Sequence, residues 1–147
     1  MARSDFAFAF PFRVRYSEID GQGIVFNAHY LTFYDTAITE YMRWLPFDYP
    51  SMVKRGMDSH TVRTVVEYKR PIPYDAEIDV CVRAAKLGRS SATFLLEIHP
   101  KGADALYATG EVVWVNADQT THKSAPWPPD FVDALVKREG AKIERKA

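Results

Sequence analysis

One long run of apolar residues at helical spacing constrains the fold more than any other feature of this 147-residue chain. Between positions 30 and 44, residues that share one helix face recur every three or four places: Tyr30, Phe33, Tyr34, Ala37, Tyr41 and Trp44. A second apolar row widens that face: Leu31, Ile38, Met42 and Leu45. A helix that is apolar over so much of its circumference must be wrapped by other elements. Asn27 is its predicted N-cap, and Pro46 and Pro50 end it.

Period-two alternation predicts five strands around this helix in the chain. They cover residues 8–16, 62–69, 77–84, 92–99 and 105–116. Residues 46–60 are expected to be irregular with one short helical turn, a short amphipathic helix is expected at 131–136, and the charged tail 137–147 is expected to fray. The long helix is the only large partner for the apolar face of an antiparallel sheet. We therefore expect an α+β fold in which a five-stranded sheet curls around one central helix. It should form a single domain over residues 1–147, with its core at about 8–136.

Charge and cysteine content exclude several classes of protein. The 19 Lys and Arg residues balance 19 Asp and Glu residues, which argues against nucleic-acid binding through bulk positive charge. No apolar run approaches the ~18 residues of a membrane span. Cys81 is the only cysteine and we find no secretory-signal pattern, so we expect a cytoplasmic protein without an intrachain disulfide. The histidines lack metal-ligand spacing and no nucleotide-binding motif occurs, so we expect neither a metal nor a cofactor.

The loop between the first strand and the long helix is the place where we expect chemistry. Asp20 lies in the segment Asp20-Gly21-Gln22-Gly23, a few residues before the helix begins. The two glycines let the backbone approach a ligand closely. The first turn of the helix offers unpaired N–H groups at the positive end of its dipole. A carboxylate and an oxyanion-binding site within one loop suit the hydrolysis of an acyl compound.

Three segments in order carry a family resemblance. They are residues 15–30 around Asp20, the run Val66-Glu67-Tyr68-Lys69-Arg70-Pro71, and the run Leu87-Gly88-Arg89-Ser90-Ser91. The chain resembles, over residues 10 to 135, the 4-hydroxybenzoyl-CoA thioesterase family of hotdog-fold acyl-CoA thioesterases. That family includes the bacterial proteins associated with the Tol-Pal cluster.

The resemblance implies a hotdog fold and assigns roles to two positions. Asp20 matches the catalytic carboxylate, acting as nucleophile or general base, and a backbone N–H near Asn27 matches the oxyanion donor. The resemblance also implies a homodimer or homotetramer with the active site at the dimer interface. One position departs from the pattern, because the Tol-Pal-associated branch carries a histidine where this chain has Asn27. The branch that acts on aromatic CoA thioesters lacks that histidine and is an equally good model.

Further residues are candidates for binding the substrate. Those expected near the acyl group are Gly23, Ala28, His29, Tyr30, Tyr34 and His60. Those expected to hold the CoA phosphates, through cations, hydroxyls and turn amides, are Lys86, Arg89, Ser90 and Ser91. Lys69 and Arg70 rank below them for this role. Each set has a structural alternative: the tyrosines as core, the histidines as satisfied polar groups, and the 86–91 segment as a solvated hairpin.

These observations predict an acyl-CoA thioesterase acting on an aromatic or a short to medium acyl group. One alternative is a thioesterase for acyl-carrier-protein thioesters. A second is a hotdog protein that binds acyl thioesters without catalysis, which the intact Asp20 disfavours. A third is an enoyl-thioester hydratase, but that chemistry usually pairs the aspartate with a histidine five places on, where this chain has Val25.

Overall fold

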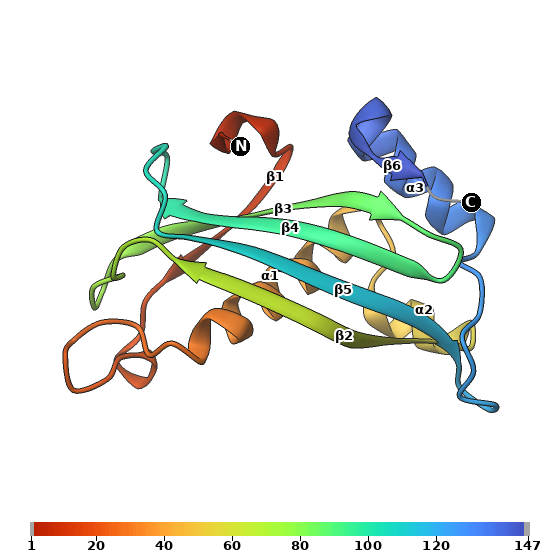
Figure 1. Ribbon diagram of the computed structural model, residues 1–147, viewed down its shortest axis with the longest axis horizontal. Helices are drawn as coiled ribbons and strands as arrows, with labels where there is room; N and C mark the ends of the chain where they lie inside the picture. The colour runs from red at the N-terminus through yellow and green to blue at the C-terminus, as the bar shows by residue number, and fades with distance from the viewer. Residues whose placement is uncertain (1, 146–147) are drawn as a thin grey trace.

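A curved antiparallel sheet with one long helix against its face dominates the computed structural model, which describes residues 2–145 (Figure 1). The helix is α1 (His29–Trp44). The long strands are β1 (Phe8–Arg13), β2 (Met57–Tyr68), β3 (Glu77–Leu87), β4 (Ser91–Pro100) and β5 (Ala108–Asp118). Their order across the sheet is β1-β3-β4-β5-β2, and every neighbouring pair is antiparallel. The predicted packing of a sheet around the long apolar helix is confirmed.

The apolar rows of α1 are buried against the inner face of the sheet. Ala37, Ile38 and Tyr41 are each 0% exposed, and Phe94 of β4 meets the Tyr41 ring edge-on at 6.0 Å. The helix approaches β5 closely at Gly110, where an added Cβ would lie 2.4 Å from Cε2 of Tyr34. A glycine at this position therefore sets the distance between helix and sheet.

β1 and β2 form the two edges of the sheet, and β2 is the longer of the two. β1 forms one edge, a position that tolerates Pro11 because proline has no N–H to donate to a second neighbouring strand. β2 forms the other edge and is 12 residues long. Its central residues are exposed, and Val62, at a bulge in the pairing with β5, is 59% exposed. A long uncovered edge of this kind can pair with another chain.

The segment 46–60 is more regular than predicted. It contains the helix α2 (Tyr49–Lys54) and the first residues of β2, which pairs with β5 from Met57 onward. The start of β2 lies on the sheet edge and is mostly polar, so it lacks the apolar alternation that reveals the rest of the strand.

The prediction of five strands and a frayed tail is wrong for the described part of the C-terminus. Helix α3 (Pro129–Glu139) is followed by the short 3-10 helix η3 (Gly140–Lys142) and by a sixth strand, β6 (Glu144–Arg145), parallel to β3. Glu139 is the anchor: its buried Oε2 accepts hydrogen bonds from the Tyr41 hydroxyl at 2.6 Å and from the Ala84 amide at 3.0 Å.

Two short 3-10 helices, η1 (Arg3–Asp5) and η2 (Tyr16–Glu18), precede and follow β1. Within residues 2–145, none of the helices has the length and apolar character needed to cross a bilayer.

Candidate active site

The loop that carries Asp20 is held in place by backbone pairing on both sides. The Asp20 amide donates to the Ile24 carbonyl at 2.9 Å, and Ile24 bridges to Pro73. Gly23 has a φ of +75°, a conformation that favours glycine, and its amide donates to the Asp20 carbonyl at 3.0 Å. Glycine is needed here for the turn, which gives Gly23 a structural role alongside the substrate-binding role predicted for it.

A buried carboxylate at the start of the loop helps to hold it in place. Glu18 is 3% exposed and accepts from the Arg15 guanidinium and from the Arg15 amide, each at 2.7 Å. Burial alone would raise the pKa of Glu18, but these two hydrogen bonds outweigh it and hold that pKa below its ordinary value. The Glu18 carbonyl then accepts from the Phe26 amide at 2.9 Å, which ties the two ends of the loop together.

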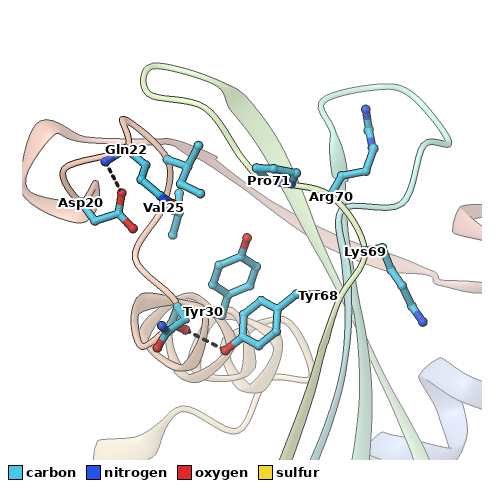
Figure 2. Close-up of a pocket in the computed structure, with 10 residues that line it drawn as sticks. Asp20, Gln22, Val25, Tyr30, Tyr68, Lys69, Arg70 and Pro71 are labelled. Carbon is cyan, nitrogen blue, oxygen red and sulfur yellow. Dashed lines mark hydrogen bonds between the residues drawn. The ribbon is translucent and has the colours of Figure 1, made fainter.

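Asp20 faces a cavity of about 290 Å³ at the beginning of α1 (Figure 2). Its Oδ1 accepts from the Gln22 amide at 2.7 Å, which fixes the direction of the carboxylate. The other residues that line the cavity come from the loop, the helix start, the last residue of β2 and the segment after it: Gln22, Ile24, Val25, Asn27, Tyr30, Tyr68, Lys69, Arg70 and Pro71. The structure thus brings Asp20, Asn27 and Tyr30 together, as predicted.

The helix start presents free backbone donors to this region. The His29 amide donates to the Phe26 carbonyl at 2.9 Å, whereas the amides of Asn27 and Ala28 have no acceptor among the described residues. These two N–H groups, at the positive end of the helix dipole, can bind a negatively charged oxygen.

The prediction that Asn27 is the N-cap is wrong. The N-cap is Ala28, and no side chain makes a capping hydrogen bond. Asn27 instead lies in the turn before the helix, and its carbonyl accepts from the Tyr68 hydroxyl at 3.0 Å. Its backbone, and not its side chain, takes part in the local structure.

Tyr30 and Tyr68 form an aromatic wall in the cavity (Figure 2). Their rings meet edge-on, with centroids 4.7 Å apart. Burial is the main reason that the pKa of Tyr30 is raised to about 12, so its hydroxyl stays neutral at physiological pH. Tyr68 belongs to one of the segments that carry the family resemblance, but its alternation pattern predicts only a strand residue. Its place in the cavity depends on a contact with residue 27, which no local pattern reveals.

Of the six predicted substrate-binding residues, Tyr30 alone lines this cavity in a single protomer. Gly23 and Ala28 lie in the loop and at the helix start beside it. Tyr34, His29 and His60 have other surroundings. Tyr34 is 1% exposed and lines a separate cavity of about 180 Å³ between α1 and β2. His29 is half-buried and packs against the Phe26 ring at 6.0 Å. His60 is exposed near the other end of β2, where its Nε2 lies 3.2 Å from Oδ2 of Asp58.

The predicted CoA-binding hairpin also lies at the far end of the sheet from Asp20. Ser91 pairs with Val115, which pairs with His60, whereas Tyr68 pairs with Ala108. His60 and Tyr68 are eight positions apart on β2, so the two rows lie roughly 26 Å apart at ~3.3 Å per residue.

The backbone of this hairpin is used to hold the chain that leads to α3. The carbonyls of Arg89 and Ser91 accept from the Trp127 amide at 3.0 Å and from the Trp127 indole at 2.9 Å. The Arg89 side chain is exposed. One protomer therefore does not bring Lys86, Arg89, Ser90 and Ser91 to the Asp20 cavity.

Lys69 and Arg70, which the sequence ranked below the hairpin, do line the Asp20 cavity, but their side chains point away from Asp20 (Figure 2). The Arg70 guanidinium donates to the Ala105 carbonyl at 3.0 Å and lies 4.4 Å from the Tyr107 ring centroid.

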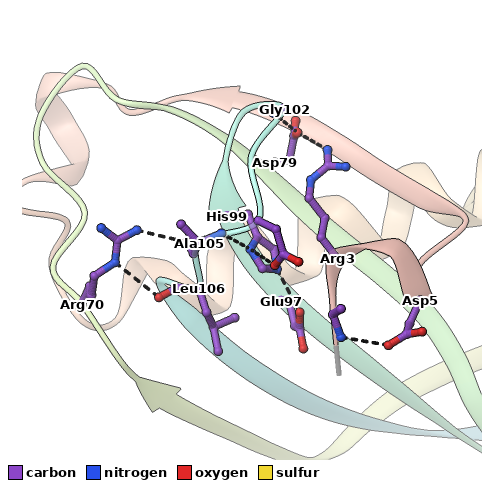
Figure 3. Close-up of polar contacts among 11 residues, drawn as sticks. Arg3, Asp5, Arg70, Asp79, Glu97, His99, Gly102, Ala105 and Leu106 are labelled. Carbon is purple, nitrogen blue, oxygen red and sulfur yellow. Dashed lines mark hydrogen bonds and ion pairs between the residues drawn. The ribbon is translucent and has the colours of Figure 1, made fainter.

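A second buried polar cluster lies on the outer face of the sheet (Figure 3). His99 is 1% exposed, and its Nδ1 accepts from the Ala105 amide at 3.1 Å. Nε2 therefore carries the ring proton and donates to Glu97 at 2.9 Å. Arg3 pairs with Asp79 in the same region. None of these side chains lines the Asp20 cavity, and the cluster holds the loop that in turn holds Arg70.

A family model described as the thioesterase-like superfamily matches residues 14–135 of the chain. The chain belongs to this superfamily. The match includes the Asp20 loop, α1 and all the long strands except β1, and it confirms the predicted hotdog fold.

Two curated proteins are similar to this chain in sequence. A protein named acyl-CoA thioesterase YbgC from Haemophilus influenzae is 37% identical over 83 residues, covering 56% of this chain and 52% of that protein. An Escherichia coli protein named acyl-CoA thioester hydrolase YbgC is 26% identical over 125 residues, covering 85% of this chain and 92% of that one.

Among solved structures, a DHNA-CoA thioesterase from Staphylococcus aureus superposes with a TM-score of 0.81 at 26% identity, covering 88% of each chain. A hypothetical protein from Aquifex aeolicus gives a TM-score of 0.81 at 26% identity, covering 87% of this chain and 98% of that chain.

Proposed function

We propose that this protein is an acyl-CoA thioesterase that hydrolyses an aromatic or short to medium acyl-CoA to the free acid and CoA. The observation that carries the proposal is the cavity lined by Asp20 and Asn27 beside the start of α1. The backbone N–H groups of Asn27 and of the neighbouring Ala28 lack an acceptor among the described residues. Thioester hydrolysis needs a group that attacks or activates water and donors for the oxyanion. Family membership and the names of the relatives support the same reaction.

Asp20 can act in either of two ways. As a nucleophile, its carboxylate oxygen forms a bond to the thioester carbon, the carbon–sulfur bond breaks, and water then hydrolyses the mixed anhydride. As a general base, it takes a proton from a water molecule that adds to the same carbon, and that proton passes to the leaving thiolate. In both, the N–H groups of Asn27 and Ala28 bind the oxyanion. When water attacks the Asp20 carbonyl carbon of the anhydride, single turnover in ¹⁸O-water places ¹⁸O in the Asp20 side chain. The general-base route places it in the product acid, so a labelled Asp20 identifies the nucleophilic route.

The aromatic wall and the neighbouring residues would hold the acyl group near the reacting carbon. Tyr30 offers a buried ring in the cavity, and Gly23, Ala28 and His29 belong to the loop and helix start around it. Tyr34 lies one helical turn further on, in the cavity between α1 and β2, and would contact a longer acyl group.

A second copy of the chain would complete the site. Antiparallel pairing of the exposed β2 edges about a two-fold axis would place the His60 end of one β2 beside the Tyr68 end of the other. The partner's hairpin, on the same row as His60, would then approach this protomer's Asp20 cavity and offer Lys86, Arg89, Ser90 and Ser91 to the CoA phosphates. We propose a homodimer, or a homotetramer made of two such dimers, acting in the cytoplasm as a single-domain protein without a cofactor.

A free-thiol release assay over short, long and aromatic acyl-CoAs tests the proposed activity. Release from at least one acyl-CoA is the expected result. Release only from acyl-carrier-protein thioesters would replace the proposed substrate class. Absence of release, together with acyl-CoA that copurifies and is found by mass spectrometry, would identify a binding protein instead.

The shared site has its own tests. Light scattering should give a dimer or larger particle, and a monomer at assay concentration would contradict the arrangement. Arg89→Glu should raise the KM for acyl-CoA, whereas Lys137→Glu, an equally exposed cation on α3, should leave that KM unchanged.

A further inference from the structure

The hydroxyl of Tyr68 connects the end of β2 to the start of α1. It donates to the Asn27 carbonyl at 3.0 Å (Figure 2). Ala28, the N-cap, receives no side-chain capping bond. Among the hydrogen bonds of the described residues, the one from Tyr68 is the side-chain bond that holds the backbone of residues 26–30.

This bond acts on the peptide unit that carries a proposed oxyanion donor. The Asn27 carbonyl and the Ala28 N–H belong to one planar peptide, which is trans, since the described chain has its cis bond at Leu45–Pro46. In a trans peptide the C=O and the N–H point in opposite directions. The Asn27 carbonyl also accepts from the Tyr30 amide at 3.4 Å, so the bond from Tyr68 is the shorter of two. A hydroxyl that holds the carbonyl on one side helps to fix the direction of the N–H on the other, and that N–H lacks a protein acceptor among the described residues.

Core packing does not explain a tyrosine at this position. Tyr68 is 52% exposed, although its ring meets the Tyr30 ring edge-on with an angle of 76° between the planes. The contact with the ring of Tyr30, which is 3% exposed, supports the Tyr68 ring in the position from which its hydroxyl reaches the carbonyl.

We propose that Tyr68 is a positioning residue for the oxyanion-binding site, which it orients through the Asn27–Ala28 peptide. The inference rests on the proposed thioesterase function. Tyr68 acts through the backbone: it exchanges no proton with the substrate, and it keeps the Ala28 N–H aimed before the reaction begins. Donors that are oriented in advance need no reorganisation when charge develops on the oxygen, so the effect should appear in the chemical step.

Tyr68→Phe tests the inference because it removes the hydroxyl and keeps the ring against Tyr30. We expect kcat to fall about five- to tenfold, the loss typical of one net hydrogen bond, with KM unchanged within about twofold. The Ala28 amide resonance in a ¹⁵N-labelled sample should shift. The matched control is Tyr49→Phe, which removes the hydroxyl of a tyrosine that is 50% exposed on α2. It should leave kcat, KM and the Ala28 amide resonance unchanged.

The outcomes separate the inference from the function on which it rests. A wild-type protein that hydrolyses acyl-CoA, with an undiminished kcat in Tyr68→Phe, would overturn the positioning role alone. A raised KM with unchanged kcat would also overturn it, since Tyr68 would then only bind substrate. Absence of hydrolysis by the wild type would overturn the proposed function itself.

Discussion

Replacing Gly110 with alanine should force the central helix away from the sheet. A Cβ at this position would lie 2.4 Å from Cε2 and 2.7 Å from Cζ of Tyr34, and both distances are shorter than real Cβ contacts. The Tyr34 ring is 1% exposed between α1 and the sheet, so it can yield only by turning toward the cavity of about 180 Å³ that it lines or by moving together with the helix. Either the ring leaves its preferred rotamer or the helix moves.

The expected loss follows from this overlap. Adding a methyl group to a well-packed core destabilises a protein by typically ~1–3 kcal/mol. For a chain of this size that corresponds to a fall in Tm of about 3–10 °C, measured by circular dichroism or calorimetry. Gly21→Ala is the matched control, because a Cβ there meets nothing within 4 Å and Gly21 has no positive φ. Its free energy of unfolding should stay within about 0.5 kcal/mol of the wild type.

A second substitution checks that Tyr34 is the cause. Tyr34→Leu removes Cε2 and Cζ, the two atoms that the new methyl group would overlap. In the double variant the Gly110→Ala step should therefore destabilise less than in the wild-type background. The reasoning is refuted if Gly110→Ala is as stable as Gly21→Ala, or if the losses from the two positions simply add.

Three further predictions concern buried groups. Burial raises the pKa of Tyr30 to about 12 and raises those of Tyr34 and Tyr41 as well, above the unfolded value near 10, so stability is complete below pH 10 and is lost as pH rises beyond it. Because the three tyrosines then ionise only in the unfolded chain, urea unfolding should show a fall in stability of about 1 kcal/mol from pH 9 to 10 and about 3 kcal/mol from pH 10 to 11. A flat profile would contradict their burial. The Cys81 residue is 1% exposed, and burial raises the pKa of its thiol to about 12. A thiol reagent at pH 8 should therefore label Cys81 far more slowly in the native protein than in denaturant. Rapid labelling of the native protein would be inconsistent with this burial. Glu139→Ala removes the carboxylate that accepts from the Tyr41 hydroxyl and the Ala84 amide. It should lower the free energy of unfolding by about 2–4 kcal/mol. An unchanged urea midpoint would show that Glu139 does not anchor the C-terminal segment.

The central helix could be predicted because its signal is local. Tyr30, Phe33 and Tyr41 recur at helical spacing, and a helix with that face has to be enclosed whatever the rest of the chain does. The position of Asp20 between a strand end and a helix start also followed from the order of elements.

Other features depend on contacts between distant parts of the chain. The C-terminal segment is ordered because Glu139 meets Tyr41, 98 positions earlier, and a charged sequence gives no sign of such a partner. Asn27 has the chemistry of an N-cap, yet Tyr68 engages its carbonyl in the turn before the helix. Lys86 and Arg89 have the chemistry of a phosphate site, but strand register, which a single segment does not reveal, places them at the far end of the sheet.

The kcat of Asp20→Asn on the best acyl-CoA substrate tests the central claim most directly. The substitution keeps the size of the side chain and one carbonyl oxygen for the Gln22 amide, so the fold should be unchanged. The account predicts a fall in kcat of about 10²–10⁴-fold, the contribution typical of a positioned acid or base, with an unchanged circular dichroism spectrum. Asp133→Asn, at an exposed position on α3, should retain wild-type kcat. Full activity in Asp20→Asn would contradict the account, because the carboxylate at the start of the central helix would then play no part in the reaction.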